Sequence, residues 1–150
     1  MELYLYDFSE LDGEDVKDGG RYGYAPLDYY WEESGRFAFL VRGDGRLAGF
    51  ALLRRGTCFP ERDVLSDDSG MMITEFIVMR KYRHQGIGKQ VARELFEHYP
   101  GRWEVAELPQ NAAGLAFWRK TIGEYTRGDY EEVLLDNERW HGPVQVFDNN

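Results

Sequence analysis

Residues 80–89 combine basic side chains with two glycines, a composition suited to binding an anion. The segment reads RKYRHQGIGK and joins an apolar run typical of a buried strand to a periodic stretch typical of a helix. The unpaired amides and the dipole of a helix N-terminus favour negative charge, and glycine lets a ligand approach the backbone closely. We therefore predict a phosphate-binding loop here, although a plain helix start with solvated charges would use the same residue types.

The charge pattern around this loop supports an anionic ligand. From Phe76 through Arg93 the chain has five Lys or Arg residues and no acid, whereas the whole chain has a net charge of −9. A nucleotide-hydrolysing P-loop is excluded because Arg83 stands where glycine is needed and Gln90 replaces Ser or Thr. The dinucleotide-binding pattern G-x-G-x-x-G, started at Gly86, would need glycine at position 91, where the chain has Val91. A nucleotide-binding protein that uses the same loop stays open as an alternative.

Glu75 is the candidate general base. It is the acid that interrupts the apolar run of residues 71–79. Burial raises the pKa of a carboxyl group, which brings it toward the range useful for taking a proton. The competing interpretation is a structural glutamate that faces solvent or pairs with an arginine. Glu104 and Glu107, on the next predicted strand, are the second-choice bases.

Hydrophobic periodicity places these residues on a mixed series of strands and helices. We predict strands at residues 36–42, 47–53, 71–79, 103–108, 130–135 and 144–147, and helices near residues 3–11, 27–33, 86–99 and 111–121. The first two strands form a hairpin around the turn at 43–45, and residues 56–70 form a loop. The order predicts an α+β (mixed α/β) domain around one sheet that spans residues 1–150.

Composition excludes several classes of protein. The single cysteine, Cys58, rules out an internal disulfide and a thiolate zinc site, and three scattered histidines give no metal site. An acidic chain is poorly suited to nucleic acid, and no apolar run approaches the length of a membrane span. The acidic N-terminus lacks the basic start of a signal peptide. We expect a cytoplasmic protein with no metal, nucleic-acid partner or membrane partner.

Residues 83–88, RHQGIG, match the R/Q-x-x-G-x-G/A motif and resemble the GNAT superfamily of N-acetyltransferases, which bind acetyl-coenzyme A. With the strand before the motif and the helix headed by Asn111, the resemblance extends over about residues 36–135. It implies the GNAT fold, a mostly antiparallel sheet flanked by helices, whose two splayed central strands receive the pantetheine arm. The first strand of that fold has no counterpart here. We therefore expect it to be absent, which exposes a sheet edge and makes a homodimer one assembly to consider.

The resemblance also implies roles for individual residues. The backbone of Phe76, Ile77 and Val78 would hold the pantetheine and acetyl groups. The pyrophosphate would lie on the loop formed by Arg83, His84, Gln85, Gly86, Ile87, Gly88 and Lys89. Asn111 would bond the cofactor arm, or it only caps its helix. Trp118 stands where many members have a tyrosine acid, and it packs against the cofactor or belongs to the core. Tyr82 and Tyr125 are other candidate acids.

The implied activity is transfer of an acetyl group from acetyl-CoA to a primary amine of a small cationic molecule or a peptide. The first 35 residues contain ten acids and two bases, which would attract a cationic acceptor or only provide a solvated surface. A non-catalytic acyl-CoA-binding regulatory module of the same fold is the alternative function.

Overall fold

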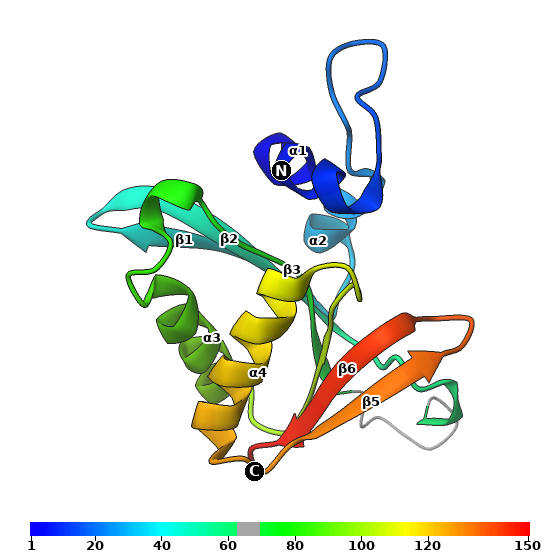
Figure 1. Cartoon of the computed structure of the whole chain (residues 1–150), viewed down its shortest axis with the longest axis vertical. Coiled ribbons are helices and arrows are strands. Elements are labelled where there is room, and N and C mark those ends of the chain that lie inside the picture. The colour runs from blue at the N-terminus through cyan, green and yellow to red at the C-terminus, as the bar shows by residue number, and fades with distance from the viewer. Residues whose placement is uncertain (63–69) are drawn as a thin grey trace.

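The computed structural model describes residues 1–62 and 70–150, and its elements follow the predicted order (Figure 1). The helices are α1 (Glu2–Asp12), α2 (Tyr29–Glu32), α3 (Ile87–His98) and α4 (Ala112–Thr126), and the strands are β1 (Arg36–Gly43), β2 (Arg46–Arg55), β3 (Met71–Val78), β4 (Arg102–Ala106), β5 (Glu131–Asp136) and β6 (His141–Asp148). The predicted mixed α+β class is confirmed. Residues 63–69 of the predicted loop lie outside the described residues.

The six strands form one sheet in the order β1-β2-β3-β4-β6-β5. Every neighbouring pair is antiparallel except β3 and β4, which are parallel. The parallel pairing runs only from Met71 opposite Trp103 to Ile73 opposite Val105, whereas β3 continues to Val78. The two central strands therefore separate after Ile73 and Val105, as predicted, and we call this point the strand fork.

A β-bulge at Thr74 changes which side chains of β3 face each side of the sheet. Leu52 lies opposite Glu75 and Leu53 opposite Ile73, so Thr74 is the extra residue. Ile73 belongs to the core beneath α3 and α4. Thr74 and Glu75 instead bond tyrosines of the N-terminal segment, on the opposite face. The bulge thereby delivers a carboxylate to the fork from a strand whose preceding residues are buried.

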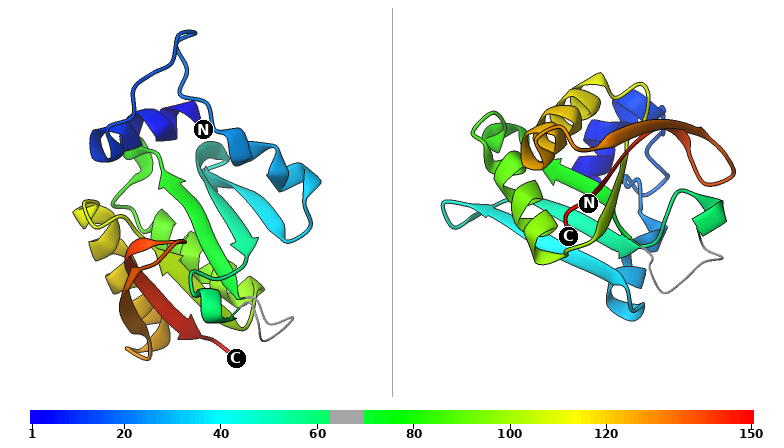
Figure 2. Two further views of the ribbon diagram at one scale, coloured as in Figure 1. Left: turned by 90° about the vertical axis from the view of Figure 1, so that its right-hand side faces the viewer. Right: turned by 90° about the horizontal axis from the view of Figure 1, so that it is seen from below.

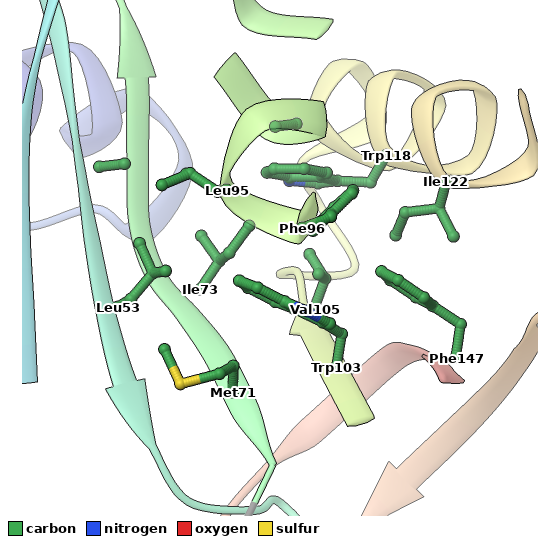
Figure 3. Close-up of a cluster of buried hydrophobic side chains, with 12 residues drawn as sticks. Leu53, Met71, Ile73, Leu95, Phe96, Trp103, Val105, Trp118, Ile122 and Phe147 are labelled. Carbon is green, nitrogen blue, oxygen red and sulfur yellow. The ribbon is translucent and has the colours of Figure 1, made fainter. Parts of the chain in front are cut away.

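The main core lies between the sheet and the helix pair α3 and α4, and Figure 3 shows its side chains meeting from both layers. Phe96 and Trp103 are fully buried, with ring centroids 4.9 Å apart. A side chain at Gly88 would place its Cβ 3.2 Å from the Phe117 ring. Glycine at this position therefore lets α3 pack closely against α4, independently of any ligand.

The N-terminal segment covers the other face of the sheet. The Tyr4 ring of α1 lies edge-on to Phe50 at 5.6 Å. Residues 13–24 project from the body of the molecule as a long loop (Figures 1 and 2). The Glu2 carboxylate ties the loop back to α1, since it accepts hydrogen bonds from the amides of Tyr22 at 2.7 Å and Gly23 at 3.0 Å.

Two elements are longer than the sequence predicts. Helix α4 continues past Thr121 to Thr126, and β6 begins at His141 because it pairs with β5 as well as β4. In the described part of the chain, no helix has the length and apolar character needed to cross a membrane.

Candidate active site

The loop between β3 and α3 has the backbone geometry of an anion site. After a short 3-10 turn at Arg80–Tyr82, His84 has φ 61° and Gly86, the N-cap of α3, has φ 81°. The backbone amides of residues 84–89 donate to no acceptor within the described residues. A Cβ at Gly86 would have no heavy atom within 4 Å among them. The predicted phosphate loop therefore presents free donors beside open space.

The basic side chains around the loop are largely paired with acids, which the sequence did not indicate. Asp7 of α1 bridges Arg80 and Arg83, with 2.7 Å from its Oδ2 to Arg83 Nη2. Burial raises the pKa of Asp7, but the hydrogen bonds from Arg83 and Arg80 outweigh it and hold that pKa below its usual value. Lys89 pairs with Glu124. The unpaired backbone amides, more than these paired side chains, are therefore the donors that remain available to a phosphate.

Arg83, the first residue of the motif, has a clear structural role. Its Nε donates to the carbonyl oxygen of Val78 at 2.7 Å, while its Nη2 reaches Asp7. Its guanidinium therefore connects the end of β3, the anion loop and α1. Lys81 lies 5.5 Å from the Tyr82 ring centroid and pairs with no carboxylate of residues 1–62 or 70–150.

Glu75 lies on the β3 branch of the strand fork, and two tyrosine hydroxyls donate to its carboxylate. Tyr4 donates to Oε2 and Tyr24 donates to Oε1 at 2.9 Å. Burial raises the pKa of Glu75, the two tyrosine hydrogen bonds lower it, and nearby Glu107 raises it, with a net upward shift. Burial and the Glu75 charge raise the pKa of both tyrosines, so they stay protonated as donors.

Glu107 lies on the other branch of the fork, two residues after Val105. Burial raises the pKa of Glu107 against hydrogen bonds from Asn111 and the Leu108 amide. Asn111 caps α4, and its Oδ1 accepts from the Gly114 amide at 3.0 Å. A Cβ at Gly114 would lie 2.5 Å from Asn111 Nδ2 and 2.7 Å from Glu107 Oε2, so this glycine makes room for both side chains.

Three other candidate residues, Trp118, Tyr125 and Glu104, are packed in the interior instead of lining the fork or the anion loop. Trp118 is buried in the main core (Figure 3). Its ring lies 5.0 Å from that of Phe76. Tyr125 packs on Phe96 at 5.1 Å in the same core. Glu104 is fully buried and accepts hydrogen bonds from Thr57 Oγ1 and the Cys58 amide, both at 2.7 Å.

Sequence reasoning missed Tyr4 and Tyr24 as partners of Glu75. They precede Glu75 by 71 and 51 residues, so no local spacing connects them with it. The only signal was the high number of tyrosines in the N-terminal segment.

A profile of the acetyltransferase (GNAT) family matches residues 5–123, most of the chain. The chain belongs to the GNAT acetyltransferase family. The match includes the anion loop, both branches of the fork and the start of α4. GNAT enzymes use acetyl-CoA as cosubstrate, and the unpaired amides with open space at Gly86 fit its phosphates. Within the described residues, no cluster of His, Cys, Asp and Glu could hold a metal ion.

Solved GNAT structures share the fold at low sequence identity. An acetyltransferase from Thermus thermophilus has 14% identity and a TM-score of 0.66, over 95% of this chain and 82% of that one. The ribosomal-protein-S18-alanine N-acetyltransferase of Escherichia coli has 12% identity and a TM-score of 0.58, over 98% and 86%. PaiA N-acetyltransferase from Thermoplasma acidophilum, solved with coenzyme A, has 13% identity and a TM-score of 0.54, over 83% and 67%. No curated protein matches the sequence.

Proposed function

We propose that this protein transfers the acetyl group of acetyl-CoA to a primary amine of a small cationic molecule or a peptide. The observation that carries the proposal is the position of Glu75. Its carboxylate has a raised pKa and lies at the strand fork, directly before the segment proposed to hold the acetyl group. Family membership supports the acetyl transfer, and the carboxylates at the fork support an amine acceptor.

Residues of the fork and the anion loop would hold acetyl-CoA. Beyond Ile73 the edge of β3 that faces away from β2 has no strand partner in the described part of the chain. The backbone of Phe76, Ile77 and Val78 would run beside an extended ligand on that side, where the Val78 carbonyl oxygen already accepts from Arg83 Nε at 2.7 Å and keeps one lone pair for it. The amides of His84 to Lys89 would hold the phosphates, and Asn111 at the head of α4 would contact the cofactor arm.

Acetyl-CoA, when bound, supplies the reactive thioester. The acceptor amine is protonated near neutral pH and must lose a proton before it can attack a carbonyl carbon. Glu75 would take that proton, since a carboxylate with a raised pKa is a stronger base than an ordinary one. Glu107, on the other branch of the fork, adds a second negative charge that favours a cationic acceptor.

The acceptor class follows from charge. In the projecting loop, Glu14, Asp15 and Asp18 are all exposed, beside the segment that carries Tyr24. Exposed acidic residues of this kind raise the local concentration of cations around the protein. Polyamines, aminoglycosides and peptide N-termini share this chemistry. The GNAT activity and the free thiol of buried Cys58 accord with the cytoplasmic location that we propose.

The test measures thiol release from acetyl-CoA with a panel of polyamines, aminoglycosides, amino acids and peptides. We expect at least one amine to be acetylated, and Glu75→Gln to lower kcat by roughly 10²–10⁴-fold without weakening acetyl-CoA binding. The deficit should shrink at alkaline pH, where the amine deprotonates unaided. Glu131→Gln, at an exposed position on β5, is the matched control. Tight acetyl-CoA binding with no acetylated amine would favour the regulatory-module alternative.

A further inference from the structure

Both oxygens of the Glu75 carboxylate are held by tyrosines from the N-terminal segment. Tyr4, on α1, donates to Oε2, and Tyr24, at the end of the projecting loop, donates to Oε1 at 2.9 Å. A carboxylate has about four lone-pair sites, so these two bonds leave room for a further proton donor. The contacts therefore fix the orientation of Glu75 without preventing it from accepting a proton.

Both tyrosines are also held in place by contacts that do not involve Glu75. The Tyr4 ring lies between Phe8 at 5.4 Å and Phe50 at 5.6 Å, and Asp7 ties the same helix to Arg80 and Arg83. Tyr24 directly follows Tyr22 and Gly23, whose amides are bound by the Glu2 carboxylate. Helix α1 thus takes part in holding both hydroxyls on one carboxylate, through Asp7 in the case of Tyr4 and through Glu2 in the case of Tyr24.

We propose that Tyr4 and Tyr24 are positioning residues that keep Glu75 ionised and correctly oriented at the strand fork. The N-terminal segment, through residue 24, is then part of the active site and not only a cover for the sheet. This inference rests on the proposed function, in which Glu75 is the base. The tyrosines act through Glu75.

The groups around Glu75 predict the direction in which its pKa moves when a tyrosine hydroxyl is removed. Burial and Glu107 favour its neutral form, while the Tyr4 and Tyr24 hydroxyls favour its ionised form. Besides burial and Glu75, Tyr30 of α2 raises the pKa of Tyr24 and Arg36 of β1 lowers it. Loss of either hydroxyl donor therefore raises the pKa of Glu75. Because only the ionised carboxylate accepts the amine proton, the acidic limb of the pH–rate profile moves to higher pH.

The experiment compares Tyr4→Phe, Tyr24→Phe and the double variant with the unmodified protein. The matched control is Tyr22→Phe, whose hydroxyl contacts Ser9 Oγ at 3.4 Å and not Glu75. The titration of the Glu75 carboxyl is followed by ¹³C NMR in the protein without acetyl-CoA, with Glu75→Gln to identify its signal. The pH–rate profile, acetyl-CoA affinity and melting temperature are measured in parallel.

We expect each Tyr→Phe change to raise the titration midpoint of Glu75, with the largest shift in the double variant and none in Tyr22→Phe. The rate in the acidic limb should fall on the order of tenfold per hydroxyl, recover at alkaline pH and leave acetyl-CoA affinity unchanged. An unchanged midpoint in all three variants overturns the inference, as does a loss of melting temperature with an unshifted profile.

The outcomes also separate this inference from the proposed function. If Glu75→Gln keeps full activity, the assignment of Glu75 as the base fails, whatever the tyrosine variants do. If Glu75→Gln is slow and the tyrosine variants titrate like the unmodified protein, only the positioning role fails. The NMR titration gives its answer even when no acceptor has been identified.

Discussion

Gly86 and Gly88 stand two residues apart in the same motif, yet different physical constraints select them. Gly86 adopts φ 81° as the N-cap of α3, a conformation that disfavours side chains with a Cβ. Gly88 lies within α3, where a Cβ would come 3.2 Å from the Phe117 ring. The first glycine provides the turn that presents the amides, and the second lets two helices approach.

Gly86→Val is expected to abolish acetyl-CoA binding while leaving a folded protein. A branched side chain at a positive φ costs about 1–3 kcal/mol, and its bulk would occupy the open space beside the free amides. Calorimetric titration with acetyl-CoA and thermal unfolding measure the two effects separately.

Gly45→Val provides the matched control for this change. Gly45 has φ 75° in the β1–β2 turn and also has no heavy atom within 4 Å of its ideal Cβ among the described residues. It should suffer a similar loss of stability and keep its acetyl-CoA affinity. Equal affinities for the two variants would count against the assignment of the phosphate loop.

Glu75 and Glu104 lie on neighbouring strands, but their carboxylates differ in burial and in hydrogen-bond partners. Glu104 is fully buried, pairs with Arg102 at 3.1 Å and accepts two hydrogen bonds from residues 57 and 58. Among the described residues, the donors to Glu75 are two neutral tyrosines, and Glu107 is an acidic neighbour. Glu104 is enclosed in the core and Glu75 lies at the strand fork, so Glu75 is better placed to reach an acceptor amine.

Helix α1 is attached to the rest of the domain by polar contacts more than by its own apolar face. None of its residues is fully buried, and Leu3 and Tyr6 are exposed. Asp7 nevertheless connects it to the anion loop through Arg80 and Arg83. The helix that carries Tyr4 is thereby joined to the loop that would hold the phosphates.

Asp7→Asn should loosen α1 and lower stability by about 1 kcal/mol, because the ion pairs are partly exposed and screened by water. For a chain of this length that corresponds to a fall in melting temperature of about 2–4 °C. The difference from the unmodified protein should shrink at high salt. Glu10→Gln, at an exposed position on the same helix, should change little. A loss that persists unchanged in high salt would contradict an electrostatic attachment.

Some carboxyl groups of the domain have lowered pKa values and others have raised ones. Each shift makes the free energy of unfolding depend on pH. Asp7 and Glu132 have lowered pKa values because of Arg83 and Arg80 in the first case and Arg119 in the second. Their contribution is present above their ordinary pKa values and is lost as pH falls through the lowered ones. Glu75 and Glu107 have pKa values raised by burial, so their ionisation costs stability as pH rises.

Because burial raises the pKa of Glu75, the Glu75→Gln variant should unfold at a higher temperature than the unmodified protein at pH 8. The neutral amide avoids the cost of burying a charge, and the advantage should disappear below the ordinary glutamate pKa of 4.5, where Glu75 is protonated in both states. Thermal unfolding from pH 4 to 9 tests this, with Glu131→Gln as the exposed control. A variant less stable than the unmodified protein at pH 8 would mean that the tyrosine hydrogen bonds outweigh the burial.

The local pattern of the sequence was sufficient to predict the hairpin of β1 and β2, the buried strand β3, helix α3 and the loop between them. The reason is that periodicity, turn residues and caps act over a few residues, and RHQGIG is a local motif. Helix α4 was predicted too short because Gly123 and Thr126 are weak helix formers. The structure retains them in the helix, with the ideal Cβ position of Gly123 only 3.6 Å from the Tyr130 ring.

Only the tertiary structure decided which groups surround the proposed base and the anion loop. The bulge at Thr74 turns Glu75 away from the core, and Tyr4 and Tyr24 bond it from 71 and 51 residues away. Asp7 pairs with Arg83 of the motif and with Arg80 before it. Trp118 was positioned by packing against Phe76. Such contacts depend on how separate elements pack together, and no spacing within the chain encodes them because the partners meet only once the sheet and its covering segments have assembled.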